Sequence, residues 1–379
     1  MIRYDQNIST GDYGNFTMTL GLFTDDFYPH LGGIGRYVYD IAQRLPQKDL
    51  FIFSPCENRI PNHLSVKPLF HRKLRNLSFS FWLDRNVNRM VKKYRLSRIN
   101  IQCGPGGLFL LRKAGVPVIA TCYHTWWQQT RYIRSQLWKK IFIPFERRTY
   151  RLADKIICIS EDSRNRLVEK YGIPPNKPVV VHPGVDTRRF IPDDGIEKLP
   201  NSVLFVGRVD KRKGADFLIR SLPNVVRCIP EVKLYIGGLG KDLAKIKQFV
   251  KRHNLVSNVR FLGFIPDDDL NMWYNRVECV VVPSVFEGFG LTAVEAMAAG
   301  TSVICTRVDS LRQIVKSGVC GYLVDYGDTN LMAEKIVALL KDRQMRDQFG
   351  KQGREIVERY YNWDTQIQKL GDELCGAII

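Results

Sequence analysis

Two glutamates stand eight residues apart in the second half of the chain, within the run VVVPSVFEGFGLTAVEAMAAGTSVICT at residues 280–306. Glycine follows Glu287, and the small residues AMAAG follow Glu295. Small residues after an apolar strand let a ligand approach the backbone, and the N–H groups at a helix start, with the helix dipole, attract anions. The run therefore predicts a phosphate site with two carboxylates beside it.

A structural alternative exists for the second glutamate. Thr292 and Glu295 fit the capping box S/T-x-x-E, in which the glutamate only satisfies backbone groups at a helix start. Two glutamates at this spacing also occur by chance. The residues alone leave both readings open.

The elements that must position these residues alternate between strand and helix. A chain of 379 residues favours two domains. The spacing predicts a helix over 33–45 and strands over 16–24, 50–55, 116–123, 155–160, 202–208, 232–238, 259–264, 279–284 and 301–306. This order indicates an α/β protein with two Rossmann-like, doubly wound parallel sheets facing a central cleft, where ligands bind at the carboxyl ends of the strands.

Domain limits follow from the same reading. We expect a flexible tail, an N-terminal domain, a hinge rich in proline and glycine, a C-terminal domain and a polar helical tail, over residues 1–15, 16–182, 183–200, 201–360 and 361–379 respectively. Segment 179–194 (VVVHPGVDTRRFIPDD) carries the hinge signal.

Bulk composition narrows the class of protein. No stretch of eighteen apolar residues and no secretory pattern is present, so we expect a cytoplasmic protein without a transmembrane helix. The nine cysteines include no CxxC pair, and several lie in apolar runs, which favours reduced core thiols over disulfides or metal ligands.

Five motifs, in order, resemble the retaining glycosyltransferases of family 4, which have the GT-B fold. They are FYPHLGGIGRYV, VHPGVDTRRF, VGRVDKRKG, LGFIPDDDL and the E-x7-E run Glu287-GFGLTAV-Glu295. The resemblance covers residues 20 to 360. Within the family, the sequence is similar to glycolipid and phosphatidylinositol mannosyltransferase-like members. It implies hexose transfer from a nucleotide diphosphate sugar, with the acceptor bound by the first domain and the donor by the second.

The resemblance also implies roles for residues around the diphosphate and the sugar. Arg208 and Lys213 would stabilise negative charge on the leaving diphosphate. A solvated basic turn is the alternative, because Lys211 and Arg212 are adjacent. Glu287 would accept hydrogen bonds from sugar hydroxyls.

Other positions complete the implied donor site. Glu295 would bind the ribose hydroxyls, Ile265 would offer backbone groups to the base, and His124 matches the family's active-site histidine. The remaining expected donor-binding residues are Gly32, Gly33, Gly288, Phe289, Gly290, Leu291 and Thr292, with the N–H of Gly33 on the distal phosphate. No protein nucleophile is identified; the leaving phosphate oxygen would help to deprotonate the acceptor hydroxyl.

We expect no metal and no further cofactor. Residues 267–269 contain a literal D-x-D, but they follow a proline and precede a helical segment, which favours helix capping. The glycine-dense turn 235–243 lacks a full dinucleotide fingerprint. Residues 307–313 (RVDSLRQ) depart from the family's pattern and leave the donor's identity open.

Charge is concentrated in the first half. Residues 1–182 carry 29 Lys and Arg against 13 Asp and Glu, whereas residues 183–379 carry 28 against 25. Basic residues interleave with aromatics over 70–98 and 126–151, which is typical of a surface that binds anionic lipid. The expected membrane-facing residues are Arg72, Lys73, Arg75, Trp82, Lys139 and Lys140.

These observations favour a peripheral membrane enzyme with a lipid-linked acceptor. The alternatives are the same chemistry on a soluble sugar or polysaccharide and, remotely, a basic nucleic-acid-binding protein. No nucleic-acid motif accompanies the charge, and that reading leaves the second domain unexplained.

Overall fold

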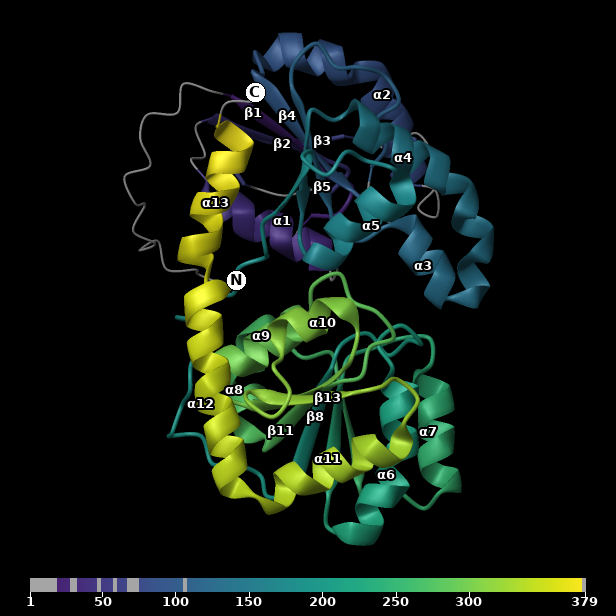
Figure 1. Cartoon of the computed structure of the whole chain (residues 1–379), viewed down its shortest axis with the longest axis vertical. Coiled ribbons are helices and arrows are strands. Elements are labelled where there is room, and N and C mark those ends of the chain that lie inside the picture. The colour runs from purple at the N-terminus through teal and green to yellow at the C-terminus, as the bar shows by residue number, and fades with distance from the viewer. Residues whose placement is uncertain are drawn as a thin grey trace. The chain divides into compact units, whose positions relative to one another are not determined.

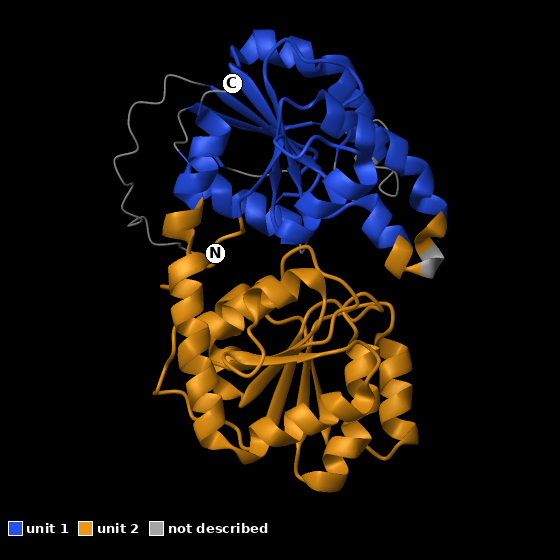
Figure 2. Cartoon of the chain, in the orientation of Figure 1, with its two compact units in different colours: residues 1–130, 138–181, 367–379 blue, residues 131–137, 182–366 orange. Residues whose placement is uncertain are grey.

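The computed structural model describes residues 19–27, 33–45, 49–56, 60–66, 75–104 and 108–376, except for the side chains of residues 75, 76, 134 and 135. The chain forms two compact units (Figure 2). One comprises residues 1–130, 138–181 and 367–379, and the other comprises residues 131–137 and 182–366. The predicted tail 1–15 lies outside the described residues.

The first unit is built on a seven-stranded parallel sheet of order β3-β2-β1-β4-β5-β6-β7 (Figure 1). The reversal of strand order beside β1 is the arrangement of a doubly wound sheet. The elements up to the sheet's last strand are β1 (Leu20–Phe23), α1 (Gly33–Arg44), β2 (Leu50–Ser54), β3 (His63–Ser65), α2 (Arg75–Tyr94), β4 (Arg98–Cys103), β5 (Val118–Cys122), α3 (Trp126–Tyr132), the 3₁₀ helix η3 (Arg134–Phe142), α4 (Ile143–Leu152), β6 (Lys155–Cys158), α5 (Glu161–Tyr171) and β7 (Pro178–Val180).

The second unit repeats the design with six parallel strands in the order β10-β9-β8-β11-β12-β13. Helices α6 and α11 lie side by side in Figure 1, and their apolar residues share one core with the strands. The elements are β8 (Ser202–Val206), α6 (Ala215–Cys228), β9 (Lys233–Gly237), α7 (Leu243–Arg252), β10 (Val259–Gly263), η4 (Asp267–Asp269), α8 (Leu270–Arg276), β11 (Cys279–Val282), α9 (Leu291–Ala298), β12 (Ser302–Thr306), α10 (Asp309–Ile314), β13 (Gly321–Val324), α11 (Thr329–Lys341) and α12 (Arg343–Tyr360).

The last helix, α13 (Trp363–Cys375), belongs to the first unit from Ile367 onward. Arg98, on β4, donates hydrogen bonds to the carbonyl oxygens of Leu374 at 2.7 Å and Gly376 at 2.9 Å. Lys155, on β6, pairs with Glu373 at 2.7 Å. The segment expected to be a tail is therefore fastened to the first sheet, which sequence patterning did not indicate.

The predicted alternation of strands and helices is confirmed, and so is the fold class of two Rossmann-like domains. One central strand was missed. β4 carries Arg98, Asn100 and Gln102 on alternate positions, yet all three are buried. Asn100 donates to Ile119 O at 3.2 Å and to Thr121 Oγ1 at 3.0 Å, so hydrogen bonds across the sheet make these polar groups compatible with the interior.

No disulfide joins any of the nine cysteines, and seven of the nine are buried, as expected for core thiols. Cys228 is exposed and Cys375 is half-buried, so these two are exceptions. No helix among the described residues is long and apolar enough to cross a membrane.

Candidate active site

The loop between β11 and α9 brings Glu287 into a buried position, where only 7% of the residue is exposed. Gly290 ends this loop with φ +120°, and a Cβ atom there would lie 2.5 Å from Leu311 Cδ2. Only glycine suits that backbone, because other residues are strained at such a φ and would collide. The glycine therefore sets the direction in which α9 leaves the loop.

Three side chains compensate the Glu287 carboxylate. Lys213 Nζ lies 2.6 Å from Oε1, Arg212 lies 3.3 Å from Oε2, and the Ser284 hydroxyl donates to Oε1 at 2.7 Å. Charge-assisted hydrogen bonds of this kind are stronger than neutral ones. The arrangement forms a buried cluster of one anion and two cations.

The loop after β8 supplies both cations. β8 and β11 are neighbours in the sheet, so the loops at their carboxyl ends meet. Gly214 has φ +72°, and a Cβ atom there would lie 1.8 Å from the carbonyl oxygen of Pro283. The N–H of Val285 also donates to Arg212 O at 2.8 Å, so backbone contacts hold the two loops together.

Electrostatics at Glu287 follow from this geometry. Burial by itself would raise the pKa of the carboxyl, but Lys213 and Arg212, with hydrogen bonds from Lys213 and Ser284, lower it to about 2. Burial lowers the pKa of Lys213, and the charge of Glu287 opposes that effect. The cluster thus holds an ionised carboxylate away from water.

Arg208 is placed differently from Lys213. Its side chain is 65% exposed and lies 3.6 Å from Asp210, rather than in the cluster with Glu287. Arg212, to which the sequence analysis gave no role at the site, is the second cation in the cluster. No sequence signal separates it from Lys211, because Lys211, Arg212 and Lys213 are consecutive.

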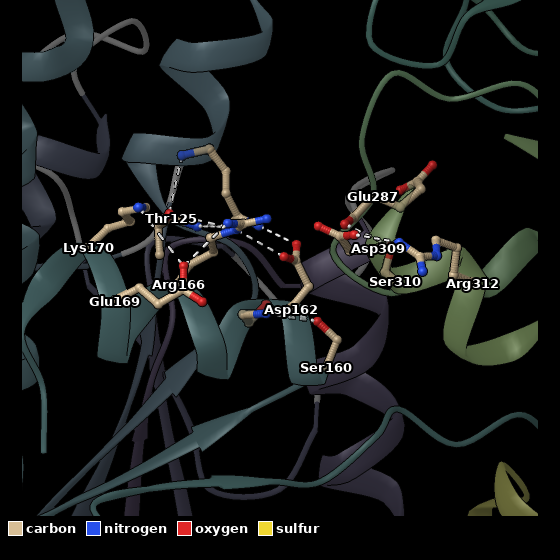
Figure 3. A network of polar contacts seen from close by, with 12 residues as sticks. Thr125, Ser160, Asp162, Arg166, Glu169, Lys170, Glu287, Asp309, Ser310 and Arg312 are labelled. Carbon is tan, nitrogen blue, oxygen red and sulfur yellow. Dashed lines mark hydrogen bonds and ion pairs between the residues drawn. The ribbon is translucent and has the colours of Figure 1, made fainter. Parts of the chain in front are cut away.

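Helix α10 adds a further support that was missed. The Ser310 hydroxyl donates to the carbonyl oxygen of Glu287 at 3.1 Å, and Asp309 pairs with Arg312 at 3.6 Å (Figure 3). These residues lie in segment 307–313, which departs from the family's pattern. The segment therefore supports the backbone that carries Glu287.

Glu295 lies on α9 and accepts a hydrogen bond from the Tyr274 hydroxyl of α8 at 2.8 Å. The capping-box alternative is wrong, because α9 begins at Leu291 with Gly290 as its N-cap and no side chain caps it. Thr292 and Glu295 are then both inside the helix. The expected ribose contact of Glu295 stays a prediction.

The other expected donor-binding residues of the second unit differ in how deeply they are buried. Phe289 is buried and stacks on His182, with ring centroids 5.6 Å apart, so it packs in the unit's interior. Ile265 is buried, and its side chain fills the space beside Gly237 that a Cβ would occupy. Phe264, before it, is 53% exposed. Gly288, Leu291 and Thr292 are half-buried and Gly290 is buried along the loop and first turn of α9.

Residues 267–269 form the short helix η4 directly before α8. Their position at a helix start is confirmed, but Asp269, the N-cap of α8, makes no capping hydrogen bond with its side chain. Among the described residues, no group of three His, Cys, Asp or Glu side chains could hold a metal ion.

In the first unit, His124 is half-buried two residues after β5. Gly104 packs against its backbone, where a Cβ would lie 2.7 Å from His124 O. The next residue, Thr125, donates its N–H to Gln128 at 2.8 Å, and Gln128 in turn bonds Asp162, which pairs with Arg166 at 3.0 Å (Figure 3). This polar network fixes the end of β5.

The first helix begins at Gly33, as expected, and Gly32 lies outside the described residues. The N–H of Gly35 donates to the Asp26 carboxylate at 3.1 Å. This carboxylate follows β1 and satisfies a backbone group at the start of α1. The proposed phosphate contact of Gly33 is left as a prediction.

Three of the expected membrane-facing positions lie outside the described part of the chain, namely Arg72, Lys73 and the side chain of Arg75. Trp82 is half-buried and stacks on buried Phe79 at 5.5 Å. Lys139 lies over the Trp126 ring at 5.2 Å, and Lys140 is exposed. Trp126 itself is buried, so it belongs to the interior.

Two doubly wound parallel sheets, one in each unit, are the architecture of the GT-B fold. Solved structures agree on the fold: a sucrose-phosphate synthase from Thermosynechococcus elongatus has a TM-score of 0.81 at 23% identity, covering 94% of this chain and 98% of its own. WaaG, a glycosyltransferase involved in lipopolysaccharide biosynthesis, has a TM-score of 0.77 at 19% identity and covers 94% of this chain and 100% of its own.

Family models for "Glycosyltransferase Family 4" and "Glycosyl transferases group 1" match residues 31–189 and 186–356. The phosphatidyl-myo-inositol mannosyltransferase of Mycobacterium leprae is 31% identical over 271 residues, covering 69% of this chain and 68% of the relative. An uncharacterized glycosyltransferase of Methanocaldococcus jannaschii is 28% identical, covering 92% and 96%. The chain belongs to glycosyltransferase family 4, and it is a glycosyltransferase.

The depressed pKa of Glu287 predicts a loss of stability in acid. Ionised Glu287 favours the folded state, so its contribution is complete above its ordinary pKa of 4.5 and disappears as the pH falls toward about 2. The shift corresponds to at most about 3 kcal/mol. Urea unfolding of wild type and Glu287→Gln should show a stability difference near neutral pH that shrinks between pH 4.5 and 2. A difference independent of pH would contradict the assignment.

Proposed function

We propose that the protein transfers a hexose, with retention of configuration, from a nucleotide diphosphate sugar to a hydroxyl of a membrane-associated glycolipid. The observation that carries this proposal is the buried Glu287 carboxylate with Lys213 and Arg212. Such a cluster, at the carboxyl edge of a doubly wound sheet, offers both cations for a diphosphate and a carboxylate for sugar hydroxyls.

The diphosphate is the natural partner of the cations. Lys213 and Arg212 both pair with Glu287, and exposed Arg208 stands five residues before Lys213. The first N–H groups of α9 add partial positive charge, because they have no acceptor within their helix. Together these groups would stabilise the negative charge that develops on the leaving group.

The remaining roles follow from position. Glu287 binds sugar hydroxyls, Glu295 the ribose, and the backbone at Ile265 the base, while His124 and Gly33 act from the first unit. The acceptor hydroxyl loses its proton to the leaving phosphate oxygen, so no protein nucleophile is needed. Support for a nucleotide-sugar donor comes from Anabaena HepE, which shares the fold at 19% identity and was solved in complex with UDP and glucose.

The acceptor class rests on different support. The curated relatives from Mycobacterium leprae and Mycolicibacterium smegmatis are phosphatidyl-myo-inositol mannosyltransferases. The excess positive charge lies in the first half, where the acceptor is expected, and would attract anionic lipid. The protein would therefore act at the cytoplasmic face of a membrane, to which it binds peripherally.

A soluble sugar acceptor is the second candidate. The observation that favours it is the shared fold with the sucrose-phosphate synthase, at a TM-score of 0.81. Dependence of transfer on vesicles or detergent separates the two. A screen of nucleotide sugars against a membrane lipid extract, read by mass spectrometry, would identify donor and acceptor together.

Replacing Glu287 by alanine should lower kcat/KM by more than about tenfold, or roughly 1.4 kcal/mol of transition-state stabilisation. The sugar would lose a hydrogen-bond acceptor that Lys213 and Ser284 hold in place. Glu334→Ala, at an exposed site on α11, is the matched control and should be silent. Circular dichroism must show both variants folded. Activity retained above a tenth of wild type in folded Glu287→Ala would remove Glu287 from the reaction.

Lys213→Ala and Arg208→Ala should each weaken the binding of a nucleoside diphosphate more than the binding of the free nucleoside, because the proposed partners of both residues are phosphates. Calorimetry with both ligands measures the two losses. Lys211→Ala removes the same charge from the same turn at an exposed position and should change neither affinity markedly. Equal losses for diphosphate and nucleoside would place these residues away from the phosphates.

Transfer should proceed in excess chelator, because Lys213, Arg208 and helix-terminal N–H groups meet the diphosphate charge. Initial rates before and after chelation test this. Turnover abolished by chelator and restored by magnesium or manganese would instead assign a metal-binding role to residues 267–269.

A further inference from the structure

Helix α4 has one buried face and one exposed face. Glu146, Thr149 and Tyr150 are fully or almost fully buried. Three large apolar residues of this region are exposed: Trp138 (62%) and Ile141 (61%) on η3, and Phe145 (43%) on α4. Large apolar side chains are thus presented to solvent beside the well-packed face of α4.

These exposed side chains stand on a rigid base. Phe142 contacts Trp126, Phe109 and Trp138, with ring centroids 5.3, 6.1 and 6.1 Å apart. Lys139 lies over the rings of Trp126 and Trp138. Phe109 also contacts Phe145 of α4, with ring centroids 6.1 Å apart, so the aromatic cluster joins η3 to α4.

The exposed face continues into a basic pocket. Its lining residues are Pro144, Arg147, Arg148, Arg151 and Leu152. Two of the arginines are anchored through Nε: Arg147 donates to Tyr171 O and Arg148 to Leu111 O, each at 2.7 Å. Anchoring at Nε fixes the guanidinium, and its terminal nitrogens remain as further hydrogen-bond donors.

No carboxylate compensates these three arginines within the part of the chain that the structure describes. Other arginines of this unit do have such a partner: Arg112 pairs with Asp84 at 3.1 Å, and half-buried Arg166 with Asp162 at 3.0 Å. Three uncompensated guanidinium groups around one pocket match a phosphate, which they can bind through paired hydrogen bonds.

We propose that this pocket binds the phosphate group of an anionic membrane lipid while Trp138, Ile141 and Phe145 enter the lipid interface. The proposal rests on the lipid acceptor proposed above and names the surface that brings the enzyme to it.

A nucleic acid is the less suitable partner for this face. Its phosphates would satisfy the arginines, but the exposed tryptophan, isoleucine and phenylalanine would gain no apolar surroundings against a duplex backbone. A lipid interface satisfies both halves of the face at once.

Co-sedimentation with vesicles tests the pocket, using phosphatidylcholine alone or mixed with phosphatidylglycerol. Replacing Arg147, Arg148 and Arg151 together by glutamine should weaken binding to the mixed vesicles by about 100-fold. Glutamine at Lys245, Lys251 and Arg252 removes three exposed charges from α7 and is the matched control, expected to lose much less. Trp138→Ser with Ile141→Ser should weaken binding independently of salt. Arg151→Gln alone, at an exposed site, carries the test if the triple variant does not fold.

Losses that are equal for the pocket and α7 variants would show attraction by net charge only and overturn the proposal. So would binding to a DNA duplex that is tighter than binding to vesicles and depends on the same arginines. Release by inorganic phosphate or glycerol phosphate at low concentration would identify a soluble phosphate ligand instead. Hydrolysis of the nucleotide sugar should be unchanged in the pocket variants. The two proposals can therefore fail separately: vesicle binding tests the pocket, and hydrolysis of the nucleotide sugar tests the transferase.

Discussion

The buried carboxylate of Glu287 is the constraint around which the second unit is arranged. An uncompensated charge at this depth would be costly, so two cations and a hydroxyl must be held against it. This requires the loops after β8 and β11 to touch, which they do because their strands are adjacent and Gly214 allows the backbones to meet. The helix start at Gly290 and the support from Ser310 complete the same loop.

A second buried glutamate, in the first unit, shows what happens without cations. Glu146 accepts hydrogen bonds from the Tyr171 hydroxyl and the N–H of Trp126, yet burial raises its pKa to about 8. Opposite shifts for two carboxyls of similar burial follow from the presence or absence of Lys213 and Arg212. The role of Glu146 is structural, because its hydrogen bond from Trp126 joins α4 to the start of α3.

Charge has different uses in the two units. In the second unit, Lys213 and Arg212 are compensated by the buried carboxylate of Glu287. In the first unit the arginines of α4 lack carboxylate partners among the described residues and lie beside exposed apolar side chains. This division fits an enzyme that binds a soluble nucleotide sugar with one unit and approaches a membrane with the other, as we propose.

Local sequence determined the strands and helices, the fold class and the loop that carries Glu287, because apolar periodicity and glycines act over a few residues. It failed at β4, whose alternating polar residues are buried because they find hydrogen-bond partners far along the chain: Asn100 on β5, and Arg98 at the end of α13. It also could not separate Arg212 from Lys211 or attach the last helix to the first sheet. Arg212 pairs with Glu287 across a separation of 75 positions in the chain, and Arg98 bonds Leu374 across 276 positions. Only the tertiary structure decides contacts at such separations.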